Sequence, residues 1–428
     1  MAETRTSIAP SSGTGEPPAG EAENRTPLPD AASIRRILVI TYGHIADVLP
    51  AGPALHALHD AYPQARITVL ALSYVRELFA ACPYVDEVLV QDFKYKKGTL
   101  RSRLEQLMTL AKFAPRLYRR FDMAIILHAG WRFPSRVAWL SRARVRAGYR
   151  DLSAPGTLTH PVAPYNRLES LRLQNRRVLE AVGITRLPSR LELWYTSQDD
   201  QAVQEMLAAH EVKPDDLLIG LHPGSHWTCQ EWSPQDWARV ADELVKRYQV
   251  RLVITGAADE RDLAQQIIQS MKTKHARVVD ATGQTTILQF GALVKHMRLF
   301  ICVNSAASQV GLAVGVPTLT LVGYENPVWN GPICGEPMTM IRQCDDSMPA
   351  GGWCPYQIWH TKRECHRAEC MGIGGLSLIT PNMVLRQIER QLKASGEKAN
   401  RTTTRGAQLQ VAQQRPNLRK MEQRHASQ

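Results

Sequence analysis

The chain has 428 residues and a formal net charge of +12, with 44% hydrophobic and 21% charged residues. The composition is typical of a globular protein, the length favours two domains, and no window approaches 18 consecutive apolar residues, which excludes a transmembrane helix. The first 34 residues are rich in Pro, Ser, Glu and Thr and lack the apolar core of a signal peptide. We therefore expect a disordered N-terminal tail and a cytoplasmic protein.

In the first half of the chain, short apolar runs alternate with helical patterns. Pro and Gly concentrate in residues 150–165, which we expect to form a loop. The apolar runs predict strands, and the 3.6-residue periodicity predicts helices. The predicted strands are 36–41, 65–72, 85–92, 122–129 and 144–149, and the predicted helices are 52–62, 75–82, 99–119, 135–143 and 166–184.

The second half repeats this alternation. Ser233 followed by Pro234 marks one helix start, and Thr380 followed by Pro381 marks the last. Residues 324–375 are rich in Pro, Gly, Cys and Trp and look irregular. The predicted strands are 216–222, 250–257, 276–283, 299–307 and 317–323, and the predicted helices are 198–210, 233–248, 259–271, 285–297, 308–316 and 380–394.

Strands separated by helices of ten or more residues imply parallel sheets with right-handed crossovers. The fold class is therefore α/β, with two Rossmann-like domains. We assign 35–190 to the first, 191–380 to the second, 381–394 to a C-terminal helix, and 395–428 to a basic disordered tail. Ligands of such sheets bind beyond the carboxyl ends of the strands, so the loops at those ends are candidate sites.

Two segments concentrate positive charge. Residues 92–120 carry nine Lys/Arg and two acidic residues, and residues 393–428 carry eight Lys/Arg and two Glu. The first is either a solvated helix face or a patch that meets an anionic surface such as a membrane, a phosphorylated glycan or a nucleic acid. The second is unpatterned and is typical of a disordered tail.

Four of the eight cysteines crowd the C-terminal part of the chain. No C-x-x-C pair is present, and the spacing is irregular, so reduced thiols or a local disulfide are favoured over a zinc site. No D-x-D motif suggests a metal-bridged diphosphate. We expect neither a metal nor a cofactor. The crowded cysteines are Cys344, Cys354, Cys365 and Cys370.

Several strand-end loops of the second half consist of small residues. His222, Gly224 and Ser225 form one, Gly256 lies in another, and residues 304–309 form a third. Small side chains let a ligand approach the backbone, and helix starts favour phosphate. These loops therefore favour a nucleotide-containing ligand, although tight turns alone would also use small residues. The G-x-G-x-x-G and P-loop motifs are absent.

In the first half, the segment "RRILVITYGHIADVLPAGPALHAL" resembles the N-terminal signature of glycosyltransferase family 9, the ADP-heptose:lipopolysaccharide heptosyltransferases. The segments "IGLHPGSHWTCQEWSPQDWARVADEL", "LVITGAADERDLAQQI" and "FICVNSAASQVGLAVGVPTLTLVG" are similar to later motifs of the family. The order of these motifs, over roughly 35–392, makes the resemblance specific.

The resemblance implies a GT-B fold, with the two domains facing across a cleft. It also implies inverting, metal-independent sugar transfer from a nucleotide sugar such as ADP-heptose, a substrate and not a cofactor. The family's general base matches Asp47, which would take the proton of an acceptor hydroxyl as the C–O bond forms. Without the resemblance, a helix N-cap before Val48 would be the favoured interpretation of Asp47.

The residues that match the family's donor contacts lie in the second half, and several depart from its pattern. Amides replace charged or proton-bearing groups at Asn304, Gln309 and Gln230, and an amide gives a weaker hydrogen bond to phosphate. Ala46 replaces the glycine before the base. The full donor-binding prediction is His222, Gly224, Ser225, His226, Gln230, Gly256, Glu260, Asn304, Ser305, Ala306 and Gln309, with Glu260 matching a ribose contact.

For the acceptor, Arg132 and Arg136 follow the fourth strand, and arginine suits phosphate or carboxylate groups. With the 92–120 segment they indicate an anionic glycolipid or oligosaccharide acceptor, and peripheral association with the inner membrane. Arg136 would also suit an ordinary helix surface. The alternative function is a catalytically silent GT-B protein that binds nucleotide sugar or glycan. Nucleic acid is not expected, because aromatic residues do not interleave the basic segments.

Overall fold

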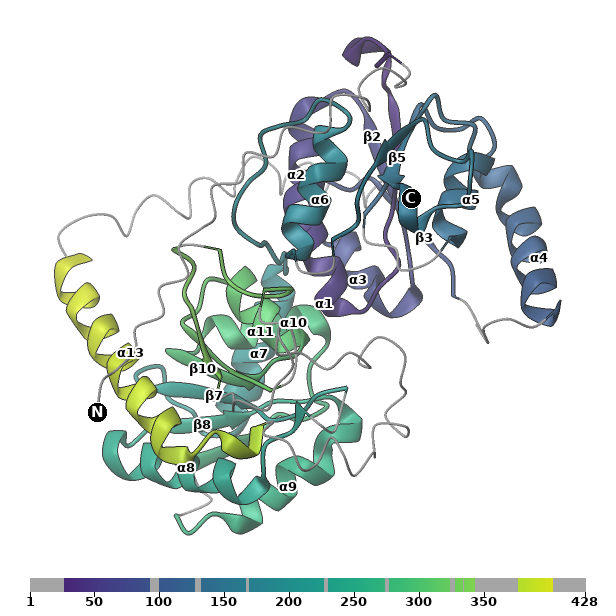
Figure 1. Cartoon of the computed structure of the whole chain (residues 1–428). Coiled ribbons are helices and arrows are strands. Elements are labelled where there is room, and N and C mark those ends of the chain that lie inside the picture. The colour runs from purple at the N-terminus through teal and green to yellow at the C-terminus, as the bar shows by residue number, and fades with distance from the viewer. Residues whose placement is uncertain are drawn as a thin grey trace.

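The computed structural model describes residues 27–92, 100–127, 132–166, 169–226, 230–273, 277–323, 328–333, 335–342 and 376–402. These residues form two lobes, each built on a six-stranded parallel sheet flanked by helices (Figure 1). We call residues 27–190 the N-terminal lobe and residues 191–402 the C-terminal lobe.

The N-terminal lobe has the strand order β3-β2-β1-β4-β5-β6, which is the Rossmann order. Its strands are β1 (Arg36–Ile40), β2 (Arg66–Ala71), β3 (Glu87–Val90), β4 (Met123–Ile126), β5 (Val145–Tyr149) and β6 (His160–Val162). Its helices are η2 (Ala31–Ser33), α1 (Ile45–Val48), η3 (Leu49–Ala51), α2 (Gly52–Ala61), η4 (Ser73–Val75), α3 (Arg76–Ala80), α4 (Leu100–Leu117), α5 (Phe133–Leu140), η5 (Arg150–Leu152) and α6 (Leu171–Glu180).

The C-terminal lobe repeats that topology with the order β12-β11-β10-β7-β8-β9. Its strands are β7 (Leu218–His222), β8 (Arg251–Ile254), β9 (Val278–Asp280), β10 (Leu299–Val303), β11 (Thr318–Val322) and β12 (Met338–Arg342). Its helices are α7 (Ser197–Ala209), α8 (Pro234–Tyr248), η7 (Ala258–Glu260), α9 (Arg261–Ser270), α10 (Ile287–Lys295), α11 (Ala306–Ala313), η9 (Leu376–Leu378) and α13 (Pro381–Thr402).

The continuous apolar runs of the central strands follow from burial on both faces of the sheet. In β1, Ile37 and Val39 belong to one buried cluster, whereas Leu38 and Ile40 belong to another on the opposite face. Strand order reverses between β1 and β4 in one lobe and between β7 and β10 in the other. These two switch points are where an α/β sheet opens a crevice for ligand, at the carboxyl ends of its strands.

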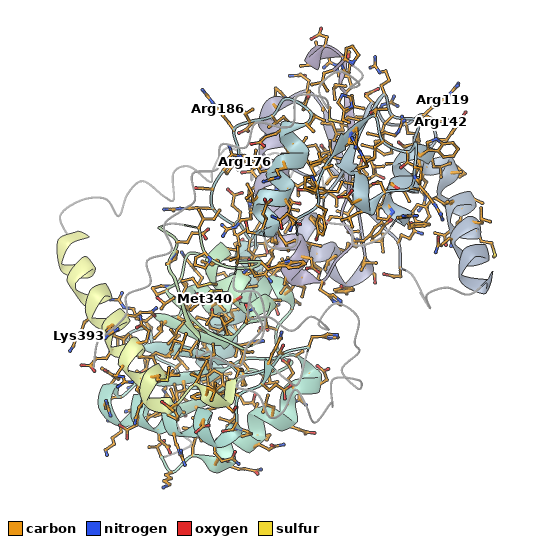
Figure 2. The ribbon with its side chains drawn as sticks, viewed as in Figure 1. Arg119, Arg142, Arg176, Arg186, Met340 and Lys393 are labelled. Carbon is orange, nitrogen blue, oxygen red and sulfur yellow. The ribbon has the colours of Figure 1, made fainter. Side chains whose placement is uncertain are left out.

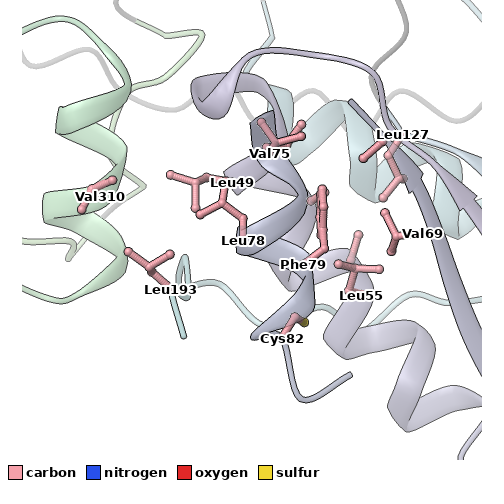
Figure 3. Close-up of a cluster of buried hydrophobic side chains, with 14 of the residues drawn as sticks. Leu49, Leu55, Val69, Val75, Leu78, Phe79, Cys82, Leu127, Leu193 and Val310 are labelled. Atoms are coloured by element: carbon pink, nitrogen blue, oxygen red, sulfur yellow. The ribbon is translucent and has the colours of Figure 1, made fainter. Parts of the chain in front are cut away.

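The two lobes share one buried apolar cluster. Leu49 and Leu78 of the N-terminal lobe belong to the same cluster as Leu193 and Val310 of the C-terminal lobe (Figure 3). Helices α1 and η3 contact α11, and α3 contacts α10. The carboxyl-end loops of the two sheets are therefore packed toward each other.

A buried ion pair also joins the lobes. Arg172 of α6 donates to both carboxylate oxygens of Glu336, at 2.5 and 2.7 Å, and to the carbonyl oxygen of Gly331 at 2.9 Å. The two charged side chains are only 7% and 9% exposed. Backbone adds a further link, because Leu171 N donates to Trp329 O at 3.2 Å.

The structure confirms the alternation of strands and helices and corrects some boundaries. The expected loop 150–165 contains β6, and the expected irregular segment 324–375 contains β12. Both are edge strands, and β6 has only three residues, including Pro161, which edge strands tolerate. The expected helix 166–184 is only Leu171–Glu180.

The first and last described elements also differ from the sequence expectation. Ile34, placed in the N-terminal tail, is 2% exposed and packs in the core. The last helix is Pro381–Thr402 and ends eight residues later than expected. It begins as predicted, with Thr380 Oγ1 accepting from Met383 N at 3.4 Å. Ser233 likewise caps α8 as predicted.

Candidate functional site

Asp47 lies in the first turn after β1, at the switch point of the N-terminal sheet. The N-cap of α1 is His44, and Asp47 Oδ2 accepts a hydrogen bond from His44 N at 2.8 Å. Asp47 is thus the third helical residue and orients the cap, but it is not the N-cap itself. A Cβ on Gly43 would lie 2.5 Å from Asp47 Cβ, so this close loop requires glycine.

The ring of His44 is held by Tyr74, which follows β2. The Tyr74 hydroxyl donates to Gly43 O at 2.9 Å and lies 3.1 Å from His44 Nδ1. Because the hydroxyl has one proton and a carbonyl can only accept, His44 Nδ1 carries hydrogen and donates to Tyr74. Tyr74 is exposed overall, but partial burial of its hydroxyl, with smaller contributions from the Asp47 and Asp92 carboxylates, raises the pKa of Tyr74 to about 12, so the phenol stays protonated.

His44 is also where the two lobes meet at the site. Its ring centroid lies 5.4 Å from that of His226, which belongs to the loop after β7. Both residues are exposed. The loop that carries Asp47 therefore faces a loop of the predicted donor-binding set.

His222 ends β7 and lies beside Thr255. The Thr255 hydroxyl donates its one proton to Leu221 O at 3.2 Å and lies 3.0 Å from His222 Nδ1. Because that proton is already used, His222 Nδ1 carries hydrogen and donates to the Thr255 oxygen. The ring keeps a small exposed part but lies among Phe290 and Phe300. Burial lowers the pKa of His222 to about 4. At neutral pH the ring therefore brings no positive charge to a phosphate.

Glu260 fits against two glycine loops. Its Oε2 accepts from Ala257 N at 2.8 Å. A Cβ on Gly224 would overlap the Glu260 carboxylate, and a Cβ on Gly256 would lie 3.0 Å from Oε2. The absence of side chains at 224 and 256 is therefore what places this carboxylate at the carboxyl edge of the C-terminal sheet, where a ribose contact was predicted.

Ser225 and Gln230 are both buried, and the Ser225 hydroxyl donates to Gln230 Oε1. The amide oxygen of Gln230 is thus turned toward Ser225, and its amide NH₂ is the part of the side chain that can donate hydrogen bonds.

The loop after β10 combines buried polar groups with a helix start. Ser305 is the N-cap of α11, and Ala306 is its first residue. The Ser305 hydroxyl is buried and has no hydrogen-bond partner among the described residues, and the same holds for Thr282 Oγ1. Asn304 is 4% exposed. Gln309 is engaged elsewhere, because its Nε2 donates to Asn330 O at 2.6 Å.

The two predicted acceptor arginines begin α5 and are exposed. Arg132 is the N-cap residue at the carboxyl edge of the N-terminal sheet. Arg136 Nη1 donates to Gln106 Oε1 of α4 at 3.1 Å, so it is turned along the lobe surface. Acceptor binding by these residues stays a prediction.

Within the described ranges there is no group of three or more His, Cys, Asp or Glu residues that could hold a metal ion. No helix in that part of the chain is long and apolar enough to cross a membrane. The cysteines Cys344, Cys354, Cys365 and Cys370 lie outside the described residues.

Sequence reasoning missed Tyr74 and Thr255, which fix the rings of His44 and His222. Both residues follow strands, β2 and β8. A survey of every strand end would have found Tyr74, because all carboxyl ends of a parallel sheet share one edge. The contact between His44 and His226 carries no local sequence signal.

Two Rossmann-like sheets with opposed carboxyl-end loops, an acid in one lobe and small-residue loops in the other, define a glycosyltransferase of the GT-B type. The sequence matches the family described as "Glycosyltransferase family 9 (heptosyltransferase)" over residues 110–349, more than half of the chain. The chain belongs to glycosyltransferase family 9.

Similar proteins agree with this assignment. Lipopolysaccharide heptosyltransferase 3 of Escherichia coli K12 is 25% identical over 288 residues, covering 66% of this chain and 81% of that protein. Lipopolysaccharide heptosyltransferase 2 of Salmonella typhimurium LT2 is 22% identical over 307 residues, covering 70% and 85%.

Solved structures show the same fold. A family 9 glycosyltransferase from Veillonella parvula superposes with a TM-score of 0.68 at 24% identity, covering 87% of this chain and 99% of the other. The ADP-heptose lipopolysaccharide heptosyltransferase II of E. coli gives a TM-score of 0.63 at 19% identity, covering 84% and 99%.

Proposed function

We propose that this enzyme transfers a heptose or similar sugar from a nucleotide sugar to a lipopolysaccharide-core or other cell-envelope glycan. The transfer inverts the anomeric carbon and needs no metal, and Asp47 is the general base. The names of the relatives support the sugar and the acceptor, since lipopolysaccharide heptosyltransferases are similar over two thirds of this chain.

The observation that carries the proposal is the position of Asp47. It lies at the N-terminal switch point, three residues after His44, whose ring lies 5.4 Å from His226 of the opposite lobe. A base on one lobe and a donor on the other is the arrangement that attack from opposite the leaving group requires.

In the reaction, the acceptor hydroxyl oxygen forms a bond to the anomeric carbon while its proton passes to the Asp47 carboxylate. The bond between that carbon and the diphosphate breaks on the other side, and the nucleoside diphosphate leaves. The hydrogen bond from His44 N to Oδ2 sets the orientation of the carboxylate before the acceptor arrives.

On the donor side, the buried Ser305 hydroxyl and the start of α11 support a diphosphate subsite. Glu260, packed against Gly224, supports a ribose subsite. His222 suits a hydroxyl better than a phosphate, because the ring is neutral at pH 7 and its Nε2 accepts. An ADP-sugar is the donor that the relatives favour, since one of them is the ADP-heptose lipopolysaccharide heptosyltransferase II of E. coli.

On the acceptor side, we propose an anionic glycolipid or oligosaccharide that Arg132 and Arg136 bind. Such an acceptor would place the enzyme at the inner face of a membrane.

The test is Asp47→Asn, assayed by nucleotide release and acceptor glycosylation across a panel of nucleotide sugars. We expect transfer to fall by about 10²–10⁴-fold, because the amide cannot take the proton. Asparagine can still accept the hydrogen bond from His44 N, so thermal stabilisation by ADP should persist. Unchanged transfer would rule out Asp47 as the base.

A catalytically silent, donor-binding protein is the second candidate. Gln309 Nε2 donates to Asn330 O, and Gln230 Oε1 accepts from the Ser225 hydroxyl. Both amides therefore make hydrogen bonds within the protein that do not involve the donor. Stabilisation by ADP-sugars without nucleotide release from any of them, in the presence of acceptor, would favour this candidate.

A further inference from the structure

The N-terminal lobe carries an exposed apolar and basic surface that extends well beyond Arg132 and Arg136, the two arginines proposed to bind the acceptor. We call it the α4–α5 face: α4 with its C-terminal turn (residues 106–120) and α5 with its C-terminal turn (residues 132–144). Of the nine large hydrophobic side chains that are exposed in the described residues, four belong to it: Leu107 (64%), Met108 (64%), Tyr118 (48%) and Trp139 (42%).

The charged side chains of the α4–α5 face are all basic. Residues 106–120 and 132–144 contain no acidic residue. Glu105 directly precedes the first of these ranges in α4. Asp122, which follows that range, is turned to the start of β1, where it accepts from Arg35 N and Arg36 N at 3.0 Å. The exposed basic residues are Lys112, Arg116, Arg119, Arg120, Arg132, Arg136, Arg142 and Arg144.

Two of these arginines sit together beside exposed aromatic rings. The turns that carry them are joined by a hydrogen bond from Arg119 N to Ser141 O at 2.9 Å. The Arg142 guanidinium lies 4.3 Å from the Trp139 ring centroid, and that of Arg119 lies 5.4 Å from the Tyr118 centroid. Figure 2 shows Arg119 and Arg142 on the side of the N-terminal lobe turned away from the C-terminal lobe.

We propose that the α4–α5 face docks on a bilayer that contains anionic lipid. Amphipathic helices bind such surfaces by burying apolar side chains at the headgroup boundary while basic residues meet the negative lipid. Tyr and Trp are the side chains enriched at that boundary. The uniform positive charge selects anionic headgroups, and exposed Leu107 and Met108 favour a bilayer over a nucleic acid, which needs no aliphatic contact.

This inference deepens the proposed role at a membrane, but vesicle binding does not require sugar transfer. The α4–α5 face and Asp47 belong to the same lobe, so docking would bring a lipid-linked acceptor to the lobe that carries the base.

The backbone offers a clean test. Arg119 and Arg142 both have φ of +56°, a left-handed conformation that glycine adopts without strain. The double variant R119G/R142G therefore removes two charges without destabilising the fold. Glu211 and Gln249 of the C-terminal lobe have φ of +55° and +54°, so E211G/Q249G makes the same backbone change away from the face and is the matched control.

The experiment is co-sedimentation of the full chain with phosphatidylcholine vesicles, with and without phosphatidylglycerol. We expect binding that requires phosphatidylglycerol and weakens with salt. Each arginine near an anionic surface contributes about fivefold in affinity, so R119G/R142G should bind vesicles about 30-fold more weakly than the wild type. E211G/Q249G should bind like the wild type. Leu107→Ser with Met108→Ser should weaken binding about tenfold.

Equal binding by R119G/R142G and the wild type would overturn the proposal, because the basic residues 403–428 would then account for the binding. So would absence of vesicle binding, or binding to duplex DNA alone. Stabilisation by ADP and nucleotide release should be unchanged in R119G/R142G. If wild-type transfer fails while selective vesicle binding holds, the proposed function is wrong and this inference stands.

Discussion

The imidazole rings of His44 and His226 lie 5.4 Å apart and come from opposite lobes. His44 is fixed on its other side by Tyr74, whose hydroxyl lies 3.1 Å from Nδ1. The loop that carries Asp47 is therefore attached to Tyr74 in its own lobe and faces a loop of the opposite lobe through the His44 ring.

We expect His44→Ala to lower kcat/KM for transfer by about tenfold, equivalent to about 1.4 kcal/mol. The exposed ring contributes little to stability, so the melting temperature should hardly change. Tyr74→Phe should act in the same direction, because it removes the hydroxyl that orients the ring. If the two residues act as a unit, the double variant will be no slower than the slower single variant. Fully additive effects in this cycle would contradict the coupling.

Gly224→Ala should weaken donor binding. The new methyl group would overlap the Glu260 carboxylate and push it from the Ala257 N–H. We expect a higher KM for the donor and a smaller thermal shift with ADP. Gly52→Ala is the control, since its new Cβ would make an ordinary contact of 3.4 Å with Trp194. An unchanged donor KM in Gly224→Ala would mean that Glu260 does not contact the nucleotide.

His222 should make stability fall in acid. Burial lowers its pKa to about 4 in the folded protein, whereas an unfolded histidine titrates near 6.5. The unfolded chain therefore binds the proton more readily. The contribution of neutral His222 to the free energy of unfolding is fully present above pH 6.5 and is lost as the pH falls toward 4. The contribution is about 3 kcal/mol.

His222→Gln supplies the comparison, because glutamine can keep a hydrogen bond to Thr255 but does not titrate. Urea unfolding at several pH values should show a flatter decline for the variant between pH 6.5 and 4. Parallel curves for the two proteins would show that His222 is not buried as the structure has it.

Arg172→Met should destabilise the protein by about 3–5 kcal/mol, because Glu336 would remain as a buried, unpaired charge. Arg176→Ala is the matched control on the same helix. Its pair with Glu180 is 52% and 38% exposed, and Figure 2 shows Arg176 at the surface, so its loss should cost less than about 0.5 kcal/mol. Urea unfolding measures both. Equal losses would indicate that the pair between the lobes is not buried in solution.

The sequence by itself determined the alternation of elements and the family. Apolar runs such as Ile37–Ile40 predict buried strands from local periodicity, and Ser233 followed by Pro234 predicts a helix start, because these signals depend on neighbours within a turn. The loop with Asp47 could be singled out because it follows the first strand. Strand β6 escaped prediction because it has only three residues and includes a proline, and β12 escaped because it lies in a segment rich in Pro, Gly and Cys.

Only the tertiary structure decided which side chains meet. Arg172 and Glu336 are 164 residues apart, and His44 and His226 belong to different sheets. Glu260 lies on Gly224 because two strand-end loops converge at one edge. Contacts of this kind depend on the crossovers and on how one lobe packs against the other, and neither leaves a periodic signal in the sequence.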